Sequence, residues 1–154
     1  MLEIKITTIN FDMDGTIANL YANPQWLPML RAYDPTPYET AEVLVNMSRL
    51  ARYIHKAQQM GIQVNIISWL SKESNTDYDQ AVTSAKMEWL RRHLPSVDFD
   101  AVHIVPYGVP KETLADPTCG ILFDDEQRNR ENWGETAYEP NVIFDVLKDL
   151  LTTL

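Results

Sequence analysis

The sequence predicts an α/β fold in which a parallel β-sheet is flanked by helices. Short runs rich in β-branched and apolar residues alternate with longer segments of amphipathic pattern. Such strand–helix–strand units give parallel strands joined by right-handed crossovers. Clusters of polar residues follow three of the expected strands. Because ligands bind at the carboxyl ends of the strands in folds of this class, the clusters are expected to lie together at one edge of the sheet.

The first part of the chain is expected to form one strand, a flap and a long helix. The run from Ile4 to Phe11 is rich in β-branched residues and predicts the first strand. Residues 18–37 contain four prolines and are expected to form a short flap with a short helix. A long helix is predicted from Tyr38 to Met60, because apolar residues from Val43 onward recur at steps of three and four. Gly61 suits its C-terminal cap.

The second half of the chain repeats the alternation of strands and helices. Each short apolar run is followed by a polar stretch or by a segment of amphipathic pattern. The expected elements, in order, are a strand at Val64 to Ser68, a loop at Lys72 to Asp79, a helix at Gln80 to His93, a strand at Ala101 to Val105, a loop at Pro106 to Pro117, a strand at Gly120 to Phe123, a short helix at Glu126 to Asn132, a weak strand at Thr136 to Tyr138 and a last helix after Pro140 with Asn141 as its N-cap.

Length and composition are typical of one globular domain. The chain has 154 residues, of which 45% are hydrophobic and 23% charged, so residues 1–154 are expected to form one unit with a sizeable core. The single cysteine, Cys119, excludes a disulfide within the chain and a metal site built from several cysteines. No apolar run is long enough to span a bilayer, and the start lacks the pattern of a secretory signal. A soluble cytoplasmic protein is therefore expected.

The charge balance narrows the classes of partner. The 13 Lys and Arg residues stand against 22 Asp and Glu residues, which gives a formal net charge of −9 at pH 7. Nucleic acids and anionic membranes both attract basic protein surfaces, so general nucleic-acid binding and membrane attachment are disfavoured. A homo-oligomer is compatible with this composition, and the oligomeric state stays open.

Two aspartates directly follow the first expected strand, in the segment Asp12-Met13-Asp14-Gly15-Thr16. Alternate residues on an extended tip share a face, so both carboxylates can point to one centre, and Gly15 lets the backbone turn tightly there. Two clustered carboxylates repel each other unless a cation or a shared proton compensates the charge. Mg²⁺ is the natural cation because it prefers hard oxygen ligands. A polar turn after a strand is the alternative interpretation.

The segment Phe11-Asp12-Met13-Asp14-Gly15-Thr16 resembles the first motif of the haloacid dehalogenase-like (HAD) superfamily of phosphohydrolases. Three further segments resemble the remaining motifs in the right order. Ile66-Ile67-Ser68 is similar to the second motif, Lys111 to the third, and Ile121-Leu122-Phe123-Asp124-Asp125 to the fourth, with Lys86 as the competing lysine. The resemblance spans nearly the whole chain, and it implies a three-layer Rossmann-like HAD core with little or no cap domain.

The resemblance also implies a reaction through an aspartyl-phosphate intermediate, with Mg²⁺ as cofactor and a small-molecule phosphomonoester as substrate. Asp12 would be the nucleophile that attacks phosphorus. Asp14 would be the general acid that protonates the leaving oxygen and then the base that activates water. Trp69 is expected to line the pocket because it follows Ser68. Substrate binding is assigned to Thr16, Ser68, Trp69 and Lys111, and metal binding to Asp12, Asp124, Asp125 and, through its backbone carbonyl, Asp14.

The spacing of the motifs bears on the substrate. Caps in this superfamily insert within intervals that correspond to Ile17 to Met60 and Trp69 to Val105, and neither leaves room for a folded cap. The site is therefore expected to be open or covered by a short flap within residues 18–37. The segment Lys86 to Pro95 is similar to the 5'-deoxyribonucleotidase branch. A (deoxy)nucleoside monophosphate is the first expected substrate, with a small sugar phosphate or a phosphoprotein next.

Two other classes of function stay open. A signalling receiver domain also uses paired acids, an aspartyl-phosphate, Ser or Thr and Lys. Its acidic pair lies on the first strand, whereas here the Asp-x-Asp segment comes first and the acidic pair last. A non-catalytic relative that binds phosphate or a partner protein is the other alternative, and the presence of both Asp12 and Asp14 argues against it.

Overall fold

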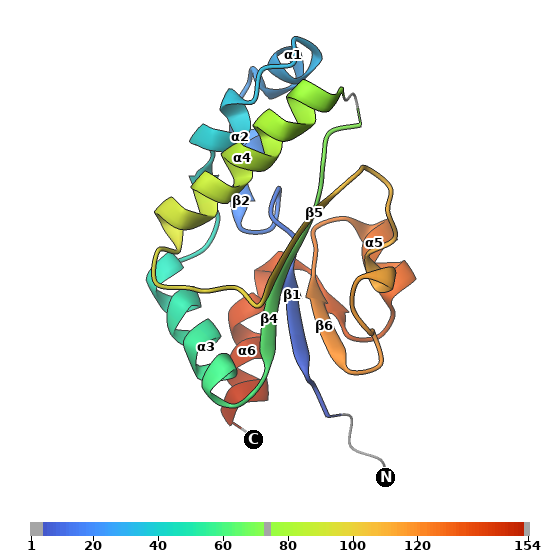
Figure 1. Ribbon diagram of the computed structural model, residues 1–154. Coiled ribbons are helices and arrows are strands. Elements are labelled where there is room, and N and C mark those ends of the chain that lie inside the picture. Colours follow the sequence, from blue (N-terminus) through green and yellow to red (C-terminus); the bar gives the residue numbers. More distant parts are fainter. Residues whose placement is uncertain (1–4, 73–74, 153–154) are drawn as a thin grey trace.

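A computed structural model describes residues 5–72 and 75–152 of the chain. Within these residues, the centre is a sheet of five parallel strands in the order β5-β4-β1-β6-β7 (Figure 1). This sheet confirms the predicted α/β class. The strands are β1 Thr8–Phe11, β4 Gln63–Trp69, β5 Ala101–Val105, β6 Gly120–Phe123 and β7 Ala137–Tyr138, and a separate antiparallel pair joins β2 Ala18–Asn19 to β3 Glu42–Val43.

Helices flank the sheet and stand beyond its carboxyl edge. Figure 1 shows α3 and α6 on one side of the sheet, α5 on the other, and α1, α2 and much of α4 past the ends of the strands. The α-helices are α1 Trp26–Arg31, α2 Thr36–Thr40, α3 Met47–Gln59, α4 Thr76–His93, α5 Gln127–Trp133 and α6 Ile143–Thr152, and the 3₁₀ turns are η1 Leu20–Ala22, η2 Lys111–Thr113 and η3 Pro140–Val142.

The main hydrophobic core lies between the sheet and helices α3 and α6. Ile9 and Phe11 of β1 pack there with Leu50 of α3 and Leu147 of α6, and all four side chains are at most 1% exposed. The burial of each such side chain stabilises the folded state by about 1.5–3 kcal/mol. This packing anchors β1 at the middle of the sheet and so fixes the position of the residues that follow it.

The other face of β1 carries a buried polar residue, Asn10. Its Nδ2 donates to the backbone oxygen of Ile121 (3.1 Å) and to Oγ1 of Thr8 (3.1 Å), and its Oδ1 accepts from Nδ2 of Asn65 (3.0 Å). Buried amides are costly unless they are hydrogen-bonded. These bonds satisfy Asn10 and tie β1 to both of its neighbours, β4 and β6.

The prediction of one long helix from Tyr38 to Met60 is wrong, because α2, β3 and α3 occupy this part of the chain. After α2 the backbone becomes extended, and Val43 of β3 pairs with Ala18 of β2. α3 then begins as a separate helix at Met47. The side chain of Asn46 caps it by accepting a hydrogen bond from the backbone N–H of Arg49 (3.0 Å). The apolar spacing continued across the break, so periodicity alone could not reveal a short strand whose pairing partner lies far away in the sequence.

Helix α4 begins at Thr76, earlier than the predicted helix from Gln80 to His93, and the predicted loop from Lys72 to Asp79 is correspondingly shorter. The side chain of Asn75 caps α4 by accepting a hydrogen bond from the backbone N–H of Tyr78 (2.8 Å). Acidic residues in the first turn add a favourable interaction with the helix dipole. Because its first turn is polar, the start of this helix has a sequence that is also typical of a loop.

Smaller differences concern the ends of the chain. β1 begins at Thr8, and the predicted start of this strand at Ile4 lies outside the described residues. Asn141 is not an N-cap, since it lies inside η3 and α6 follows directly at Ile143. The structure confirms the predicted bounds of two strands, Ala101 to Val105 (β5) and Gly120 to Phe123 (β6).

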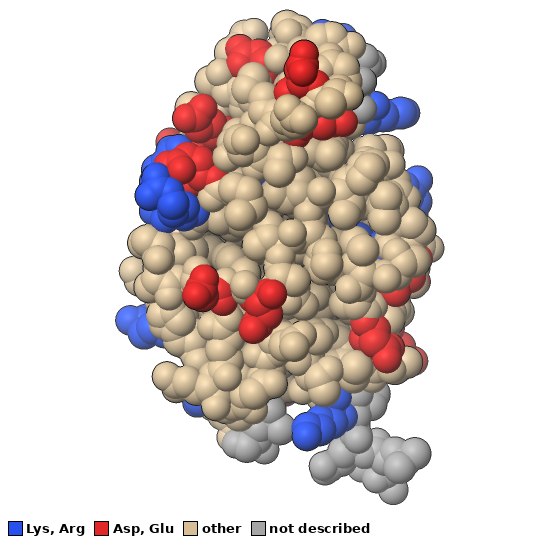
Figure 2. Space-filling model, viewed as in Figure 1, with Lys and Arg blue, Asp and Glu red and all other residues tan. Residues whose placement is uncertain are grey.

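One face of the molecule carries its negative charge in a dispersed form. On the face drawn in Figure 2, Asp and Glu side chains are scattered, and Lys and Arg side chains lie mainly toward the margins. Across the described residues, none of the helices is long and apolar enough to cross a membrane.

Candidate active site

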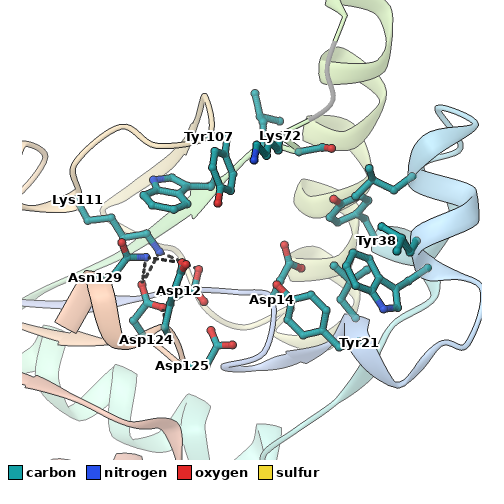
Figure 3. A pocket seen from close by; sticks show the side chains of 18 of the residues that line it. Asp12, Asp14, Tyr21, Tyr38, Lys72, Tyr107, Lys111, Asp124, Asp125 and Asn129 are labelled. Atoms are coloured by element: carbon teal, nitrogen blue, oxygen red, sulfur yellow. Dashed lines mark hydrogen bonds and ion pairs between the residues drawn. The ribbon is translucent and has the colours of Figure 1, made fainter. Parts of the chain in front are cut away.

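A cavity of about 600 Å³ lies at the carboxyl edge of the sheet (Figure 3). Asp12 follows β1, Trp69 ends β4, and Asp124 and Asp125 follow β6, so three strands deliver side chains to this cavity. It is the edge at which the sequence predicted the polar clusters to meet. Segment 20–31 supplies the opposite wall of the cavity.

Three carboxylates form the centre of the site. Asp12, Asp124 and Asp125 each offer an oxygen within 4.8 Å of the others. Burial raises the pKa of Asp124 to about 6, the charge of Asp12 adds to this effect, and Lys111 opposes it. Burial and the charge of Asp12 also raise the pKa of Asp125. The ionised forms of these carboxyl groups therefore need a positively charged partner. A compact set of carboxylate oxygens fits Mg²⁺.

Lys111, on η2, binds two of these carboxylates. Its Nζ donates to Oδ1 of Asp12 (2.9 Å) and to Oδ2 of Asp124 (2.7 Å), and its side chain is 2% exposed. Burial by itself lowers the pKa of Lys111, but Asp12 and Asp124 outweigh this effect and raise it. Lys111 therefore stays charged and lies beside the predicted nucleophile. Asn129 of α5, four residues after the acidic pair, also donates to Oδ2 of Asp124 (3.1 Å), a contact that sequence reasoning missed.

The competing lysine, Lys86, also reaches the site, but it meets different partners. Its Nζ donates to Oδ2 of Asp14 (2.9 Å) and to Oγ of Ser68 (2.7 Å). The side chain of Asp14 is 14% exposed and lines the cavity. Burial raises the pKa of Asp14, and the nearby Lys86 lowers it. The structure thus places one lysine on each of the two aspartates of the first motif.

Thr16 and Ser68, both predicted to bind substrate, lie behind the cavity wall. The Oγ1 of Thr16 donates to Oδ2 of Asp12 (3.0 Å) and accepts from the backbone N–H of Asp125 (3.2 Å). Neither Thr16 nor Ser68 is more than 1% exposed, and neither is among the described residues that line the cavity. Thr16 therefore supports the carboxylates, and Ser68 contacts Lys86. Direct contact of either with a substrate stays a prediction.

Trp69 lines the cavity and is held in place from several sides. Its Nε1 donates to the backbone oxygen of Val109 (2.7 Å), and its ring centroid lies 4.9 Å from that of Tyr107. The ammonium of Lys111 lies 5.6 Å from the centre of the indole ring. Trp69 is therefore a rigid aromatic surface next to the charged centre.

A second group of aromatic residues faces the cavity from the flap segment and α2. Tyr21 and Trp26 lie edge to face with ring centroids 5.1 Å apart, and Tyr38 of α2 lines the same wall. Sequence reasoning missed these residues, because aromatic side chains in a loop carry no periodic pattern. The available signal was their concentration directly after the Asp-x-Asp segment.

Comparisons with known proteins agree with this architecture. Neither a family model nor a curated protein matches the sequence. The D,D-heptose 1,7-bisphosphate phosphatase from Burkholderia thailandensis is similar in structure, with 13% sequence identity and a TM-score of 0.57 over 95% of this chain and 99% of that chain. A protein from Mesorhizobium loti, provisionally described as a HAD-like phosphatase, shares 17% identity and a TM-score of 0.52 over 97% and 86% of the two chains. The chain therefore has the fold of the HAD-like phosphatases.

Proposed function

We propose that the protein is a Mg²⁺-dependent phosphomonoester hydrolase of the HAD superfamily. The observation that carries the proposal is the joint placement of the Asp-x-Asp segment, the acidic pair and Lys111 around one cavity at the carboxyl edge of the sheet. The phosphatases that share its fold support the same reaction class. Together these features provide a nucleophile, an acid, a cationic side chain and a metal-binding set.

The reaction would proceed in two displacements. A carboxylate oxygen of Asp12 attacks phosphorus, the ester P–O bond breaks, and Asp14 gives a proton to the departing oxygen. Water then attacks the aspartyl-phosphate, Asp14 takes its proton, and the bond between phosphorus and Asp12 breaks. Lys111 binds the phosphoryl oxygens by charge. Mg²⁺, held by Asp12, Asp124, Asp125 and the backbone carbonyl of Asp14, would offset the repulsion between nucleophile and phosphate.

We propose a (deoxy)nucleoside monophosphate as substrate. The cavity volume of about 600 Å³ is in the range of small-molecule sites. Trp69 and Tyr107 form one aromatic wall, and Tyr21 and Trp26 another, so a planar base can stack above the charged centre.

Phosphate release tests the proposal. The purified protein should release phosphate from p-nitrophenyl phosphate and from members of a nucleotide panel in the presence of Mg²⁺, and EDTA should stop release. Asp12→Asn should abolish turnover and leave the circular dichroism spectrum unchanged, because it removes the nucleophile and keeps the side-chain shape. Activity of the Asp12→Asn variant, or a protein that releases phosphate from none of these substrates, would contradict the mechanism.

A further inference from the structure

The ammonium of Lys86 is enclosed and fully hydrogen-bonded. Lys86 is 0% exposed, and its Nζ donates to Oδ2 of Asp14 (2.9 Å), Oγ of Ser68 (2.7 Å) and the backbone oxygen of Trp69 (2.7 Å). An ammonium has three N–H donors, so these three contacts use its donor capacity. Burying a lysine is costly unless it is paired in this way. The position of Lys86 is therefore strongly determined.

The two buried lysines of the site have separate tasks. Lys111 lines the cavity and contacts Asp12 and Asp124, so it can reach a bound phosphoryl group. Lys86 is not among the described residues that line the cavity, but its partner Asp14 is. Of the two aspartates of the first motif, Lys86 thus contacts Asp14, whereas Lys111 contacts Asp12.

We infer that Lys86 is a positioning residue that holds the Asp14 carboxyl group for proton transfer, an inference that rests on the proposed phosphatase function. With Oδ2 bound to Lys86, Oδ1 is the oxygen that gives a proton to the leaving group and later takes one from water. The attack of Asp12 on phosphorus needs neither transfer when the leaving group departs as a stable anion. Loss of Lys86 should therefore impair the proton-transfer steps selectively.

Leaving-group dependence tests this role. p-Nitrophenolate departs without protonation, whereas an alkyl oxide does not. In Lys86→Met, the first-turnover burst of p-nitrophenol should keep nearly its normal rate, while the steady state slows and aspartyl-phosphate accumulates. Turnover of an alkyl phosphate should fall by about 10²-fold or more, the usual contribution of a general acid. The measurements are rapid-quench kinetics with both substrates and detection of the phosphorylated protein.

Two variants provide controls. Lys111→Met should slow the burst itself, because Lys111 contacts the nucleophile, and Lys56→Met, on the exposed side of α3, should change nothing. If Lys86→Met does not fold, the double variant Asp14→Asn/Lys86→Met removes the unpaired charge and is compared with Asp14→Asn. Equal turnover rates of the double variant and of Asp14→Asn support the inference, because Lys86 then acts through Asp14.

Three results would overturn the role of Lys86. They are a raised KM with a slow burst in Lys86→Met, equal losses on aryl and alkyl phosphates, and a double variant much slower than Asp14→Asn. Each requires an active unmodified protein. Absence of turnover in the unmodified protein would instead overturn the proposed function, and with it this role.

Discussion

At the residue scale, Gly15 allows Asp125 to approach the Asp-x-Asp segment. Its φ of 82° lies in the left-handed region, which side chains with a Cβ rarely adopt. A Cβ at this position would overlap the carboxylate of Asp125 and lie 2.6 Å from its Cγ. Glycine is thus required both by the turn and by the close packing of the acidic cluster.

Gly15→Ala should therefore displace Asp125 and weaken metal binding. The Mg²⁺ concentration for half-maximal activity should rise by about tenfold or more, which corresponds to about 1.4 kcal/mol. The free energy of unfolding should fall by about 1–2 kcal/mol from the strained backbone. A Mg²⁺ titration of activity and a urea unfolding curve measure the two effects.

Gly61→Ala is the matched control for this substitution. Gly61 has nearly the same φ, 85°, and nothing lies within 4 Å of the Cβ that alanine would add. The control should lose stability by a similar amount and keep its Mg²⁺ dependence. An unchanged Mg²⁺ requirement in Gly15→Ala would show that Asp125 does not contribute to metal binding.

At the element scale, one side chain caps the start of α3 after the break that separates it from α2. The side chain of Asn46 accepts a hydrogen bond from the backbone N–H of Arg49 (3.0 Å) and so caps α3. Asn46→Ala should lower the free energy of unfolding by about 1 kcal/mol, because the cap is lost. In a continuous helix the same substitution would raise stability, since alanine is the better helix former. The sign of the change in a urea unfolding curve decides between these two structures, and turnover should stay unchanged because α3 lies away from the cavity.

The same elements show which parts of the fold could be predicted. β5 and β6 were predicted with their bounds because each is a short apolar run between polar segments. The pairing of Val43 with Ala18 could not be predicted, since it depends on residues far apart in the sequence. The start of α4 was missed because its polar first turn is stabilised by Asn75, which also suits a loop.

At the scale of the whole molecule, one acidic cluster lies inside an already acidic protein. The chain has a net charge of −9, and Asp12, Asp124 and Asp125 are brought together against this background. Folding is therefore opposed by repulsion at the carboxyl edge of the sheet, which Lys111 offsets in part. A bound divalent cation should stabilise the folded state, because the unfolded chain has no such set of oxygens.

This stabilisation should depend on pH. Asp124 has a pKa of about 6 and Asp125 one of about 8, so both carboxylates take up protons in the metal-free protein as the pH falls, and protons then compete with Mg²⁺. Mg²⁺ at about a hundred times its Kd should raise Tm by about 5 °C or more at pH 7.5, and by much less at pH 5. Thermal melts with Mg²⁺ and with matched NaCl give the comparison. Equal shifts at both pH values, or an equal shift in Asp125→Asn, would contradict a metal site at this cluster.

Which residues meet at the site was predictable to the extent that it depends on parallel topology. Asp12 and Asp124 directly follow β1 and β6, and Ser68 lies near the end of β4. Because these parallel strands end at the same edge, the proximity of the three residues follows from the fold class. The division of carboxylates between Lys86 and Lys111 was not predictable. It depends on where α4 and η2 place the two lysines relative to the aspartates, which packing determines and sequence spacing does not.

The central place of β1 has a consequence for how activity is lost. This strand is bonded along both edges, to β4 and β6, and Asn10 ties it to the same two neighbours by its side chain. Its amide hydrogens can exchange with solvent only when the sheet as a whole opens, so they belong to the most protected set in the molecule. Asp12 is carried at the end of this strand. The proposed nucleophile should therefore keep its geometry until global unfolding, so the activity that remains during denaturation should equal the fraction of molecules that are still folded.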